Sequence, residues 1–362
     1  DIQMAANDFK KVLVLGGGKI GVAITAMLSS TGEYDVTVGD VRPVNFDMPN
    51  MKTRIVDASS EQSLTEALKE ADVVINALPF FAAKKVAKVA AEQKVHYFDL
   101  TEDVAATNAI RDIGKTATTA LMPQCGLAPG FIGIAGFDLA RQFDQLQDVK
   151  MRVGALTRYP TNALKYNLTW STDGLINEYC EPCDAIVNGE AAKVQPLEGL
   201  ETLLIDGDEY EAFNTSGGLG TLCETLEGKV RNLDYKTMRF PGHNAILKLL
   251  INDLRMIDKR DTLKDIFEHA IPYTSQDKVV VFVSVTGWKD GKYQQKTFAS
   301  RIFPQVVAGM EMTAIQLTTA GGICAAMELM RDGKLPRQGF VAQEQVKLDD
   351  FLANRWGGLY QA

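Results

Sequence analysis

The stretch KKVLVLGGGKIGVAITAMLSS, residues 10–30, constrains the fold more than any other part of the chain. A run of aliphatic residues is followed by three consecutive glycines and then by apolar residues at the spacing of one helix face. The run at 11–15 is typical of a strand that is covered on both faces in a parallel sheet. This strand–glycine–helix pattern predicts an α/β domain whose backbone approaches a ligand closely at the turn.

Strand and helix patterns alternate through the first 126 residues. The expected strands are 11–15, 35–40, 53–59, 72–79, 95–100 and 119–126, and the expected helices are 19–30, 64–71, 82–94 and 106–118. This alternation predicts a doubly wound parallel sheet of the Rossmann type.

The later part of the chain reads as an α+β domain with a mixed or antiparallel sheet. Its expected strands and hairpins are 149–156, 203–213, 228–242 and 278–303, with helices at 245–254, 260–271 and 308–331. We therefore expect a Rossmann domain at 1–126, a second domain for ligand binding and oligomerisation at 127–307, and a C-terminal helix and tail at 308–362 that returns to the first sheet. Exposed strand edges in the second domain favour a homodimer or homotetramer.

Composition narrows the class of partner. The 46 acidic and 38 basic side chains give a net charge of −8, which argues against nucleic acid and anionic membranes as partners. No apolar stretch reaches the roughly 18–20 residues of a membrane helix, and the N-terminus lacks a signal-peptide pattern. Five scattered cysteines suit reduced thiols, so we expect a cytoplasmic enzyme with a small-molecule substrate. Cys180 and Cys183 form a CxxC, but only three histidines are present, so we expect no metal site.

A GxGxxG pattern lies between the first expected strand and helix. Gly16 permits the tight turn, Gly18 lets the backbone reach a pyrophosphate, and Gly21 allows close helix–strand packing. The helix N-terminus offers unpaired N–H groups to the phosphates. Asp40, at the end of the second strand, is placed to accept hydrogen bonds from ribose hydroxyls and to repel a 2′-phosphate, so NAD is favoured over NADP.

Other residues near this turn are also candidate cofactor contacts. Arg42 leaves some use of NADP open, and Asp57 either meets the adenine ring or caps the next helix. NALPF, residues 76–80, ends the fourth strand, where its backbone is expected near the nicotinamide-side ribose. Beyond the glycines and Asp40, the expected contacts are Lys19, Ile20, Arg42, Asp57, Ala77, Leu78 and Pro79.

Three later stretches resemble the saccharopine dehydrogenase-like family of amino-acid oxidoreductases: HYFDLTED (96–103), PQCGLAPGFIGIAGFDLA (123–140) and YNLTWSTDGLINEY (166–179). The resemblance covers nearly the whole chain and is closest to the lysine 6-dehydrogenase branch. It implies NAD-dependent oxidative deamination of the ε-amine of L-lysine to allysine, which cyclises to piperideine-6-carboxylate, with release of ammonia. The alternatives are a saccharopine dehydrogenase and a non-catalytic NAD-binding regulator.

The resemblance also implies catalytic residues. Asp99 and Cys125 match positions in the catalytic neighbourhood of saccharopine reductases. An amine with a pKa of roughly 10.4 must lose a proton before hydride can leave, so a carboxylate is expected to act as base. Asp99 is the first candidate, with Glu102 or Asp103 assisting. Glu102 and Asp103 could instead cap the next helix, which is the better explanation for Asp103. Cys125 either lines the nicotinamide pocket or is a buried thiol.

Two departures from the family pattern bear on the substrate. Ala128 stands where the motif carries aspartate, and Asp173 stands where saccharopine reductases usually place an arginine that holds a substrate carboxylate. The loss of a cation and gain of an anion disfavours the tri-acidic saccharopine and favours a substrate with an extra amine.

The substrate site is expected in the second domain. Arg239 or Arg152 would hold the α-carboxylate, and Arg239 has the motif resemblance. Asp173 would pair with the α-ammonium group, which requires a turn near Ser171, and His243 would serve as proton shuttle or carboxylate partner. The expected substrate-binding residues are Tyr166, Trp170, Ser171, Asp173, Thr215, Arg239 and His243.

Overall fold

The computed structural model describes residues 8–361; residues 1–7 and 362, at the ends of the predicted domain ranges, lie outside the described part. The described chain forms two compact units. Unit 1 contains residues 8–131, 305–312 and 316–361, and unit 2 contains residues 132–304 and 313–315.

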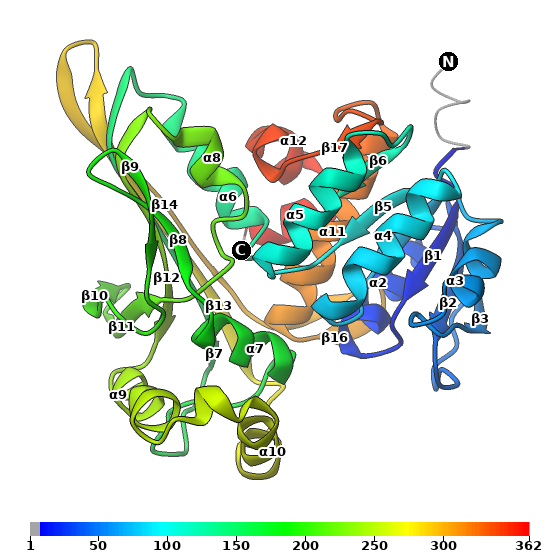
Figure 1. The fold of residues 1–362 in the computed structure, drawn as a ribbon, viewed down its shortest axis with the longest axis horizontal. Coiled ribbons are helices and arrows are strands. Elements are labelled where there is room, and N and C mark those ends of the chain that lie inside the picture. Colours follow the sequence, from blue (N-terminus) through cyan, green and yellow to red (C-terminus); the bar gives the residue numbers. More distant parts are fainter. Residues whose placement is uncertain (1–7, 362) are drawn as a thin grey trace. The chain divides into compact units, whose positions relative to one another are not determined.

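Unit 1 is built on a seven-stranded sheet in the order β17-β6-β5-β4-β1-β2-β3, in which every neighbouring pair is parallel (Figure 1). The strands are β1 (Lys11–Leu15), β2 (Asp35–Asp40), β3 (Met51–Ile55), β4 (Val73–Asn76), β5 (His96–Asp99), β6 (Ala120–Met122) and β17 (Gly339–Phe340). The chain order reverses at β1, which lies between β2 and β4. Sheets of this kind bind ligands at the carboxyl ends of the strands beside such a reversal.

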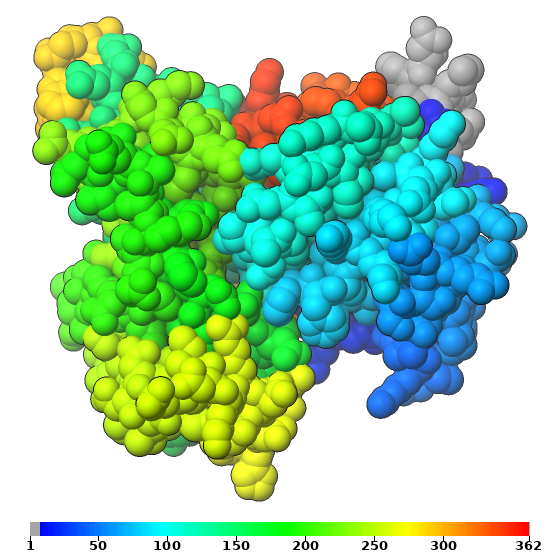
Figure 2. Space-filling model, viewed as in Figure 1, coloured from blue at the N-terminus to red at the C-terminus, as the bar shows by residue number. Residues whose placement is uncertain are grey.

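Helices cover this sheet. They are α2 (Lys19–Ser30), α3 (Glu61–Leu68), α4 (Ala83–Glu92), α5 (Val104–Gly114) and α11 (Ala314–Arg331), with a short 3₁₀ turn η1 (Phe80–Ala82). Leu13, Val74, Tyr97 and Leu121 point from alternate strand positions into a core shared with α3, α4 and α5. Figure 1 shows α4 and α5 in front of the sheet and α11, in orange, behind it, and in Figure 2 the cyan side chains of α4 and α5 hide the strands.

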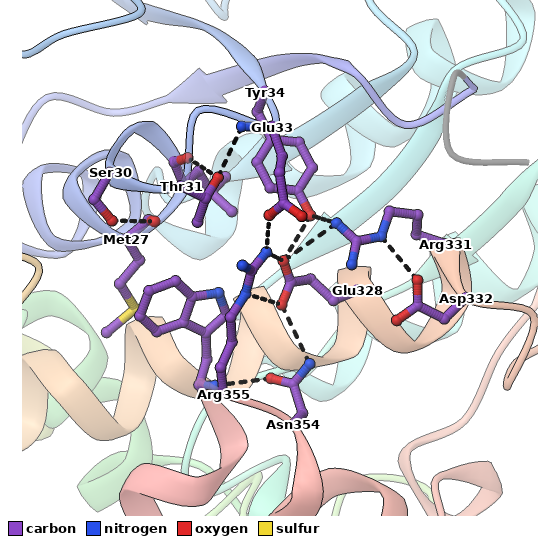
Figure 3. A network of polar contacts seen from close by, with 12 residues as sticks. Met27, Ser30, Thr31, Glu33, Tyr34, Glu328, Arg331, Asp332, Asn354 and Arg355 are labelled. Carbon is purple, nitrogen blue, oxygen red and sulfur yellow. Dashed lines mark hydrogen bonds and ion pairs between the residues drawn. The ribbon is translucent and has the colours of Figure 1, made fainter. Parts of the chain in front are cut away.

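The C-terminal segment of unit 1 is held by a buried carboxylate on α11. This segment comprises η4 (Gln343–Gln345), α12 (Leu348–Ala353) and η5 (Gly357–Tyr360). Glu328 is only 1% exposed and accepts hydrogen bonds from Tyr34 at 2.7 Å, Asn354 at 3.2 Å and Arg355 Nε at 3.0 Å (Figure 3). Arg331 also contacts both Tyr34 and Glu328. The network therefore joins the turn before β2, the helix α11 and the chain end.

Unit 2 is built on an eight-stranded mixed sheet with the path β10-β11-β12-β7-β13-β14 and with β8 and β9 attached to β12. The strands are β7 (Gln145–Thr157), β8 (Cys183–Val187), β9 (Glu190–Val194), β10 (Glu201–Ile205), β11 (Asp208–Asn214), β12 (Val230–Arg239), β13 (Asp277–Lys289) and β14 (Lys292–Ile302). The β12–β7 pair is parallel, and the other pairs are antiparallel. The predicted fold class, a Rossmann sheet plus an α+β domain with a mixed sheet, is confirmed.

Five helices belong mainly to unit 2 within the described residues. They are α6 (Phe131–Ala140), α7 (Thr172–Cys180), α8 (Leu222–Leu226), α9 (His243–Lys248) and α10 (Arg260–Ala270), with short turns η2 (Leu249–Asp253) and η3 (Met256–Asp258). Strands β10 and β14 are the edges of the sheet path. The expectation of a homodimer or homotetramer stays a prediction. Among the helices of residues 8–361, none has the length and apolar composition needed to cross a lipid bilayer.

Two predicted elements differ from the structure. The helix predicted at 308–331 begins only at Ala314, because β15 (Gln305–Val307) and β16 (Met310–Met312) form a hairpin around Ala308 and Gly309, whose φ values are 53° and 75°. The turn expected near Ser171 leads into helix α7, with the Ser171 hydroxyl accepting a hydrogen bond from the Gly174 N–H at 3.2 Å. The predicted turn near Ser171 is therefore the start of a helix.

Candidate functional site

The glycine loop of unit 1 has the geometry of a dinucleotide turn. Gly16 lies at φ +109°, and a Cβ there would be 3.1 Å from the Ala77 carbonyl oxygen. At Gly21 a Cβ would lie 1.8 Å from the Gly16 carbonyl oxygen, so only hydrogen fits. Gly18, the residue before α2, is exposed and has nothing within 4 Å of the Cβ position. The start of α2 is therefore open to an approaching phosphate group.

Asp40 is fixed beside this loop. Its carboxylate accepts hydrogen bonds from the Gly17 N–H at 2.7 Å and from the Val41 N–H at 2.7 Å. A cavity of about 350 Å³ adjoins it at the ends of β1, β2 and β4. A cavity of this size is at the small end of ligand sites, which suits part of a dinucleotide.

The same cavity gathers several of the predicted cofactor residues. Asp57, Leu78 and Pro79 line it together with Asp40. Leu78 and Pro79 therefore line the same cavity as Asp40, the predicted ribose-binding carboxylate. Lys85, which the sequence interpretation missed, also lines the cavity, and its Nζ donates to the Ser59 carbonyl at 2.8 Å.

Asp57 does not cap the following helix. The cap of α3 is Ser60, whose hydroxyl accepts a hydrogen bond from the Ser63 N–H at 3.2 Å. Asp57 instead accepts hydrogen bonds from the Ser59 hydroxyl at 2.6 Å and the Ser59 N–H at 3.0 Å, and these bonds lower the pKa of its carboxyl. The capping alternative for Asp57 is therefore wrong, and a fixed anion lines the cavity.

The other predicted cofactor residues lie around the loop. Lys19 is the first residue of α2, and its carbonyl accepts a hydrogen bond from the Gln316 side chain of α11 at 3.0 Å. Ile20 is half-buried, and Arg42 is exposed beyond β2. Ala77 contacts Gly16 as described above. Helix α11 thus supports the backbone at the start of α2.

Asp99, at the end of β5, is 1% exposed and all of its described contacts are with unit 1. Its carboxylate accepts hydrogen bonds from the Tyr97 hydroxyl at 2.6 Å and from the N–H groups of Thr101 and Gln124, both at 2.9 Å. Burial raises the pKa of Asp99 to about 6, although these three donors oppose the shift. Asp99 therefore joins the loops that follow β5 and β6, and both of its oxygens are engaged.

Cys125 is a buried thiol in the loop after β6. Its Sγ donates to the Met122 carbonyl at 3.2 Å and accepts a hydrogen bond from the Gln343 side chain at 3.3 Å. Burial raises the pKa of this thiol, so it stays protonated. These contacts favour the buried-thiol alternative.

The acidic pair after β5 divides into two roles. Asp103 caps α5, because its carboxylate accepts the Ala106 N–H at 2.8 Å, which confirms the prediction. Glu102, the neighbouring carboxylate, is half-buried.

A second cluster lies in unit 2 around Arg239, the last residue of β12, which is 2% exposed. Its Nε donates to the Tyr179 hydroxyl at 3.0 Å, its Nη1 to the Met238 carbonyl at 3.0 Å, and its Nη2 lies 3.5 Å from Glu178 Oε1. The Tyr166 ring faces the guanidinium, with its centroid 5.1 Å from Cζ. The structure thus brings together the predicted Arg239 and Tyr166.

His243 completes this cluster as a neutral ring. Its Nδ1 lies 2.9 Å from the Leu164 carbonyl, which only accepts, so the proton is assigned to Nδ1. Nε2 then accepts a hydrogen bond from the Tyr179 hydroxyl at 2.9 Å. Burial, with the Arg239 charge as the next cause, lowers the pKa of His243 to about 3. With both ring nitrogens engaged, His243 orients Tyr179, and these contacts favour the structural role over that of a proton shuttle.

The remaining predicted substrate residues have local partners. Asp173 forms an ion pair with Lys264 of α10 at 3.0 Å, and both side chains are about one-third exposed. Thr215 shares a 2.6 Å hydrogen bond with Thr237, Ser171 caps α7, and Trp170 packs against the apolar core beside α7. These residues are not brought to Arg239 by any described polar contact.

Arg152, the other candidate for binding the α-carboxylate, already forms ion pairs with two carboxylates of the protein. It is 2% exposed and bonds to Glu201 at 2.5 Å and to Asp234 at 2.6 Å. Its charge is matched within the protein, so the structure favours Arg239 for the role. Within residues 8–361, no group of three or more histidines, cysteines and carboxylates is placed to hold a metal ion.

Two family models together match most of the chain. The family model described as Saccharopine dehydrogenase NADP binding domain matches residues 12–121, and the one described as Saccharopine dehydrogenase C-terminal domain matches residues 126–355. The chain belongs to the saccharopine dehydrogenase family. The resemblance inferred from the three sequence stretches is confirmed.

Two relatives of this chain are distant from it in sequence. Alpha-aminoadipic semialdehyde synthase, mitochondrial, of Mus musculus is 24% identical over 219 residues, 58% of this chain and 24% of that protein. The Rattus norvegicus protein of the same name is 22% identical over 304 residues, 76% of this chain and 31% of that protein. This chain therefore spans less than a third of the length of these relatives.

A solved structure shows the same fold. The saccharopine dehydrogenase (L-Glu forming) of Saccharomyces cerevisiae has a TM-score of 0.69 at 16% identity, over 94% of this chain and 96% of that chain. In the saccharopine dehydrogenase family the first domain binds a nicotinamide dinucleotide, and the glycine loop, Asp40 and the adjoining cavity all lie within its matched range.

Sequence reasoning missed two members of the Arg239 cluster, Glu178 and Tyr179. Both lie on α7, within the second matched range of this saccharopine dehydrogenase-family chain. The signal that would have found them is helical: Leu175, Ile176 and Tyr179 recur at the spacing of one helix face after the Ser171 cap.

Proposed function

We propose that this chain is an NAD-dependent dehydrogenase that oxidises the ε-amine of L-lysine to allysine, with release of ammonia. Family membership supports an oxidoreductase acting on an amino acid. The preference for lysine is drawn from the charges of unit 2. The preference for NAD is drawn from Asp40.

The cofactor proposal depends on a fixed negative charge. The Gly17 and Val41 N–H groups hold the Asp40 carboxylate beside the cavity at the end of β2. A carboxylate so placed accepts hydrogen bonds from a ribose diol and repels a 2′-phosphate. Lys19 and Ile20, at the start of α2, would lie next to the pyrophosphate, and the bound nicotinamide ring would supply the hydride acceptor.

The observation that carries the substrate proposal is the state of Arg239. Its described bonds use three of the five N–H groups of a guanidinium, and the contact with Glu178 is long at 3.5 Å. Two other buried cations described in unit 2 lie closer to carboxylates: Arg152 to Glu201 and Asp234, and Lys236 to Glu201 at 3.0 Å. A buried arginine with a distant carboxylate suits a substrate with one carboxylate, and lysine has one where saccharopine has three.

The proton chemistry is proposed for the acidic loop after β5. The ε-amine must be neutral before hydride leaves its carbon, so a base must take a proton. Glu102 is proposed as this base because it is the more exposed carboxylate, whereas Asp99 is buried and Cys125 is protonated. In this proposal Asp99 positions the loop that carries Glu102.

Oxidation of saccharopine is the second candidate. It is favoured by the match of both family models over 12–121 and 126–355 and by the fold shared with the yeast saccharopine dehydrogenase. In that reaction Arg239 would bind one of the three substrate carboxylates. The other two carboxylates would have to bind exposed lysine or arginine side chains of unit 2.

One assay separates the candidates. Lysine, ornithine and saccharopine are each supplied with NAD and with NADP, and reduced nicotinamide is followed by absorbance together with ammonia release. We expect NADH and ammonia to form in equal amounts from lysine alone, at rates that rise toward alkaline pH. NADH formed from saccharopine without ammonia would replace the proposal by the second candidate. Dinucleotide binding without turnover of any substrate would indicate a regulator.

A further inference from the structure

A second cavity lies in unit 1, between the edge of the parallel sheet and helix α3. Its volume is about 440 Å³, which exceeds that of the cavity beside Asp40, and the two cavities share no lining residue. A volume of this size lies within the range of small-molecule sites. The cavity is formed by β1, β2 and β3, by α3 and by the turn that follows α3, and these elements lie at the right of Figure 1. A space of ligand size therefore exists outside the dinucleotide site.

One face of the sheet supplies the floor of this cavity. Leu13, Thr37 and Lys52 lie side by side on three neighbouring strands, because the register pairs Leu13 with Thr37 and Thr37 with Lys52. Leu13 packs in the same core as α3, so these side chains point toward that helix. Arg54 is two residues after Lys52 on β3 and points to the same face, roughly 6.5 Å further along the strand. Two cations therefore lie next to an aliphatic side chain and a hydroxyl group.

The charges of these two cations are not matched by an ion pair. Within residues 8–361, neither Lys52 nor Arg54 forms an ion pair or a side-chain hydrogen bond, and both side chains are exposed. The pKa of Glu66 is lowered mainly by its hydrogen bond with Lys69, and the charge of Arg54 is the smallest of the causes. Glu66 already pairs with Lys69 at 2.9 Å. Lys52 and Arg54 therefore repel each other until an anion binds between them.

One carboxylate faces the same cavity. Glu70, in the turn after α3, lines the cavity and forms no ion pair with any described residue. Lys11 and Asp35 also line it, but they are directly opposite one another on β1 and β2, so their charges offset each other. A ligand would thus meet two positive charges, Lys52 and Arg54, and one negative charge, Glu70.

We infer that this cavity binds a free acidic amino acid, whose two carboxylates meet Lys52 and Arg54 and whose ammonium group meets Glu70. Such a ligand has two negative charges and one positive charge, which complement the three charges of the cavity. The guanidinium binds a carboxylate through two parallel hydrogen bonds, and the lysine ammonium group acts as a point charge. The Thr37 hydroxyl, beside Lys52, can donate one further hydrogen bond.

Other ligand classes fit this pattern of charge less well. Inorganic phosphate or a simple dicarboxylate leaves Glu70 without a positive partner. A basic amino acid places a second positive charge near Lys52 and Arg54. The position of Glu70 therefore favours an acidic amino acid over other anions.

The inferred site is separate from the sites described above. It shares no lining residue with the cavity beside Asp40, and the Arg239 cluster belongs to unit 2. The inference therefore does not depend on which amino acid the enzyme oxidises.

Calorimetric titration of the protein saturated with NAD tests the inference. The ligands are L-aspartate, L-glutamate and L-2-aminoadipate, with glutarate, which lacks the amine, and inorganic phosphate for comparison. We expect at least one of the acidic amino acids to bind at one site per chain, about tenfold more tightly than glutarate or phosphate. Arg54→Gln should weaken this binding about tenfold. Glu70→Gln should weaken it to a similar degree while changing the affinity for glutarate less than about twofold.

A matched control is Lys115→Gln, which removes one positive charge elsewhere in unit 1. Lys115 is 71% exposed, pairs with Asp112 at 2.9 Å and does not line the cavity, so the affinity should stay unchanged. Arg239→Gln should also leave it unchanged, because that residue lies in the proposed substrate cluster. The affinity for NAD reports whether each variant remains folded.

Three results would overturn the inference. The first is the absence of saturable binding of all three acidic amino acids to the wild-type protein. The second is equal affinity for glutarate or phosphate, which would indicate a general anion site. The third is binding that Arg239→Gln removes and Arg54→Gln leaves intact, which would place the amino acid in unit 2. A failure to oxidise lysine would refute the proposed function and leave this binding measurement unaffected.

Discussion

The backbone N–H of Gly17 donates a 2.7 Å hydrogen bond to the carboxylate of Asp40, so the second residue of the glycine loop and the end of β2 are joined directly. This hydrogen bond therefore fixes both the position of the glycine loop and the position of the Asp40 carboxylate beside the cavity. This relationship underlies the expected preference for NAD.

Asp40→Ser is expected to shift cofactor preference toward NADP. The substitution removes the charge that repels a 2′-phosphate and leaves the exposed Arg42 nearby. The ratio of kcat/KM for NADP to that for NAD should rise about tenfold or more, a change of about 1.4 kcal/mol. Asp35→Ser, at the exposed start of the same strand, is the control and should leave the ratio unchanged. An unchanged ratio in Asp40→Ser would refute the assignment.

Alanine substitutions at Gly21 and Gly18 are expected to have different effects on stability and on NAD affinity. Gly21→Ala places a methyl group 1.8 Å from the Gly16 carbonyl oxygen, so both the melting temperature and the affinity for NAD should fall. Gly18→Ala meets nothing within 4 Å in the protein, so stability should be kept while the methyl group obstructs the approach of the pyrophosphate. Dinucleotide titration and thermal unfolding measure the two quantities. Full NAD affinity in Gly18→Ala would argue against phosphate binding there.

Asp99→Asn is expected to remove a pH dependence of stability. Because the folded pKa is raised to about 6, the stability contributed by the protonated carboxyl is present below the ordinary pKa near 3.8 and is lost as the pH rises through about 6. Relative to the asparagine variant, the wild-type protein should lose about 3 kcal/mol of unfolding free energy between about pH 4 and 7. Urea unfolding across this range measures the difference, and a constant difference would contradict the assignment.

Glu328→Gln is expected to destabilise unit 1. Burial alone would raise the pKa of Glu328, but hydrogen bonds from Arg355 and Tyr34 and the charges of Arg355 and Arg331 lower it, so the carboxylate is ionised at neutral pH. Its neutralisation leaves two arginines without their shared anion, at a cost of about 3 kcal/mol. Asp332→Asn is the control, because Asp332 is 49% exposed and its bond to Arg331 should contribute under about 1 kcal/mol. Equal unfolding free energies in the two variants would contradict this role.

The nucleotide half of the molecule could be predicted from sequence because its signals are local. The strand at 11–15, the glycines and Asp40 lie within 30 residues of one another, and each has a geometric requirement that few residue types meet. Strand β17 could not be predicted in this way. It has two residues, Gly339 and Phe340, and forms only because the end of the chain returns to β6.

The substrate half shows the opposite case. Helix α7 begins at Thr172, directly after the stretch YNLTWS, and packs in the core that contains Leu263 and Phe267. The pairing of Glu178 with Arg239 spans 61 positions and depends on the contact between α7 and the end of β12. No local pattern contains that contact, so Glu178 was missed.

Strand β17 has a consequence for how the protein is made. Its partner β6 ends at Met122, more than two hundred positions earlier, and the Glu328 network likewise joins the region of Tyr34 to Arg355. The ribosome must therefore synthesise the chain as far as Phe340 before the nucleotide-binding sheet gains β17. Until then the edge of β6 that pairs with β17 has no partner strand.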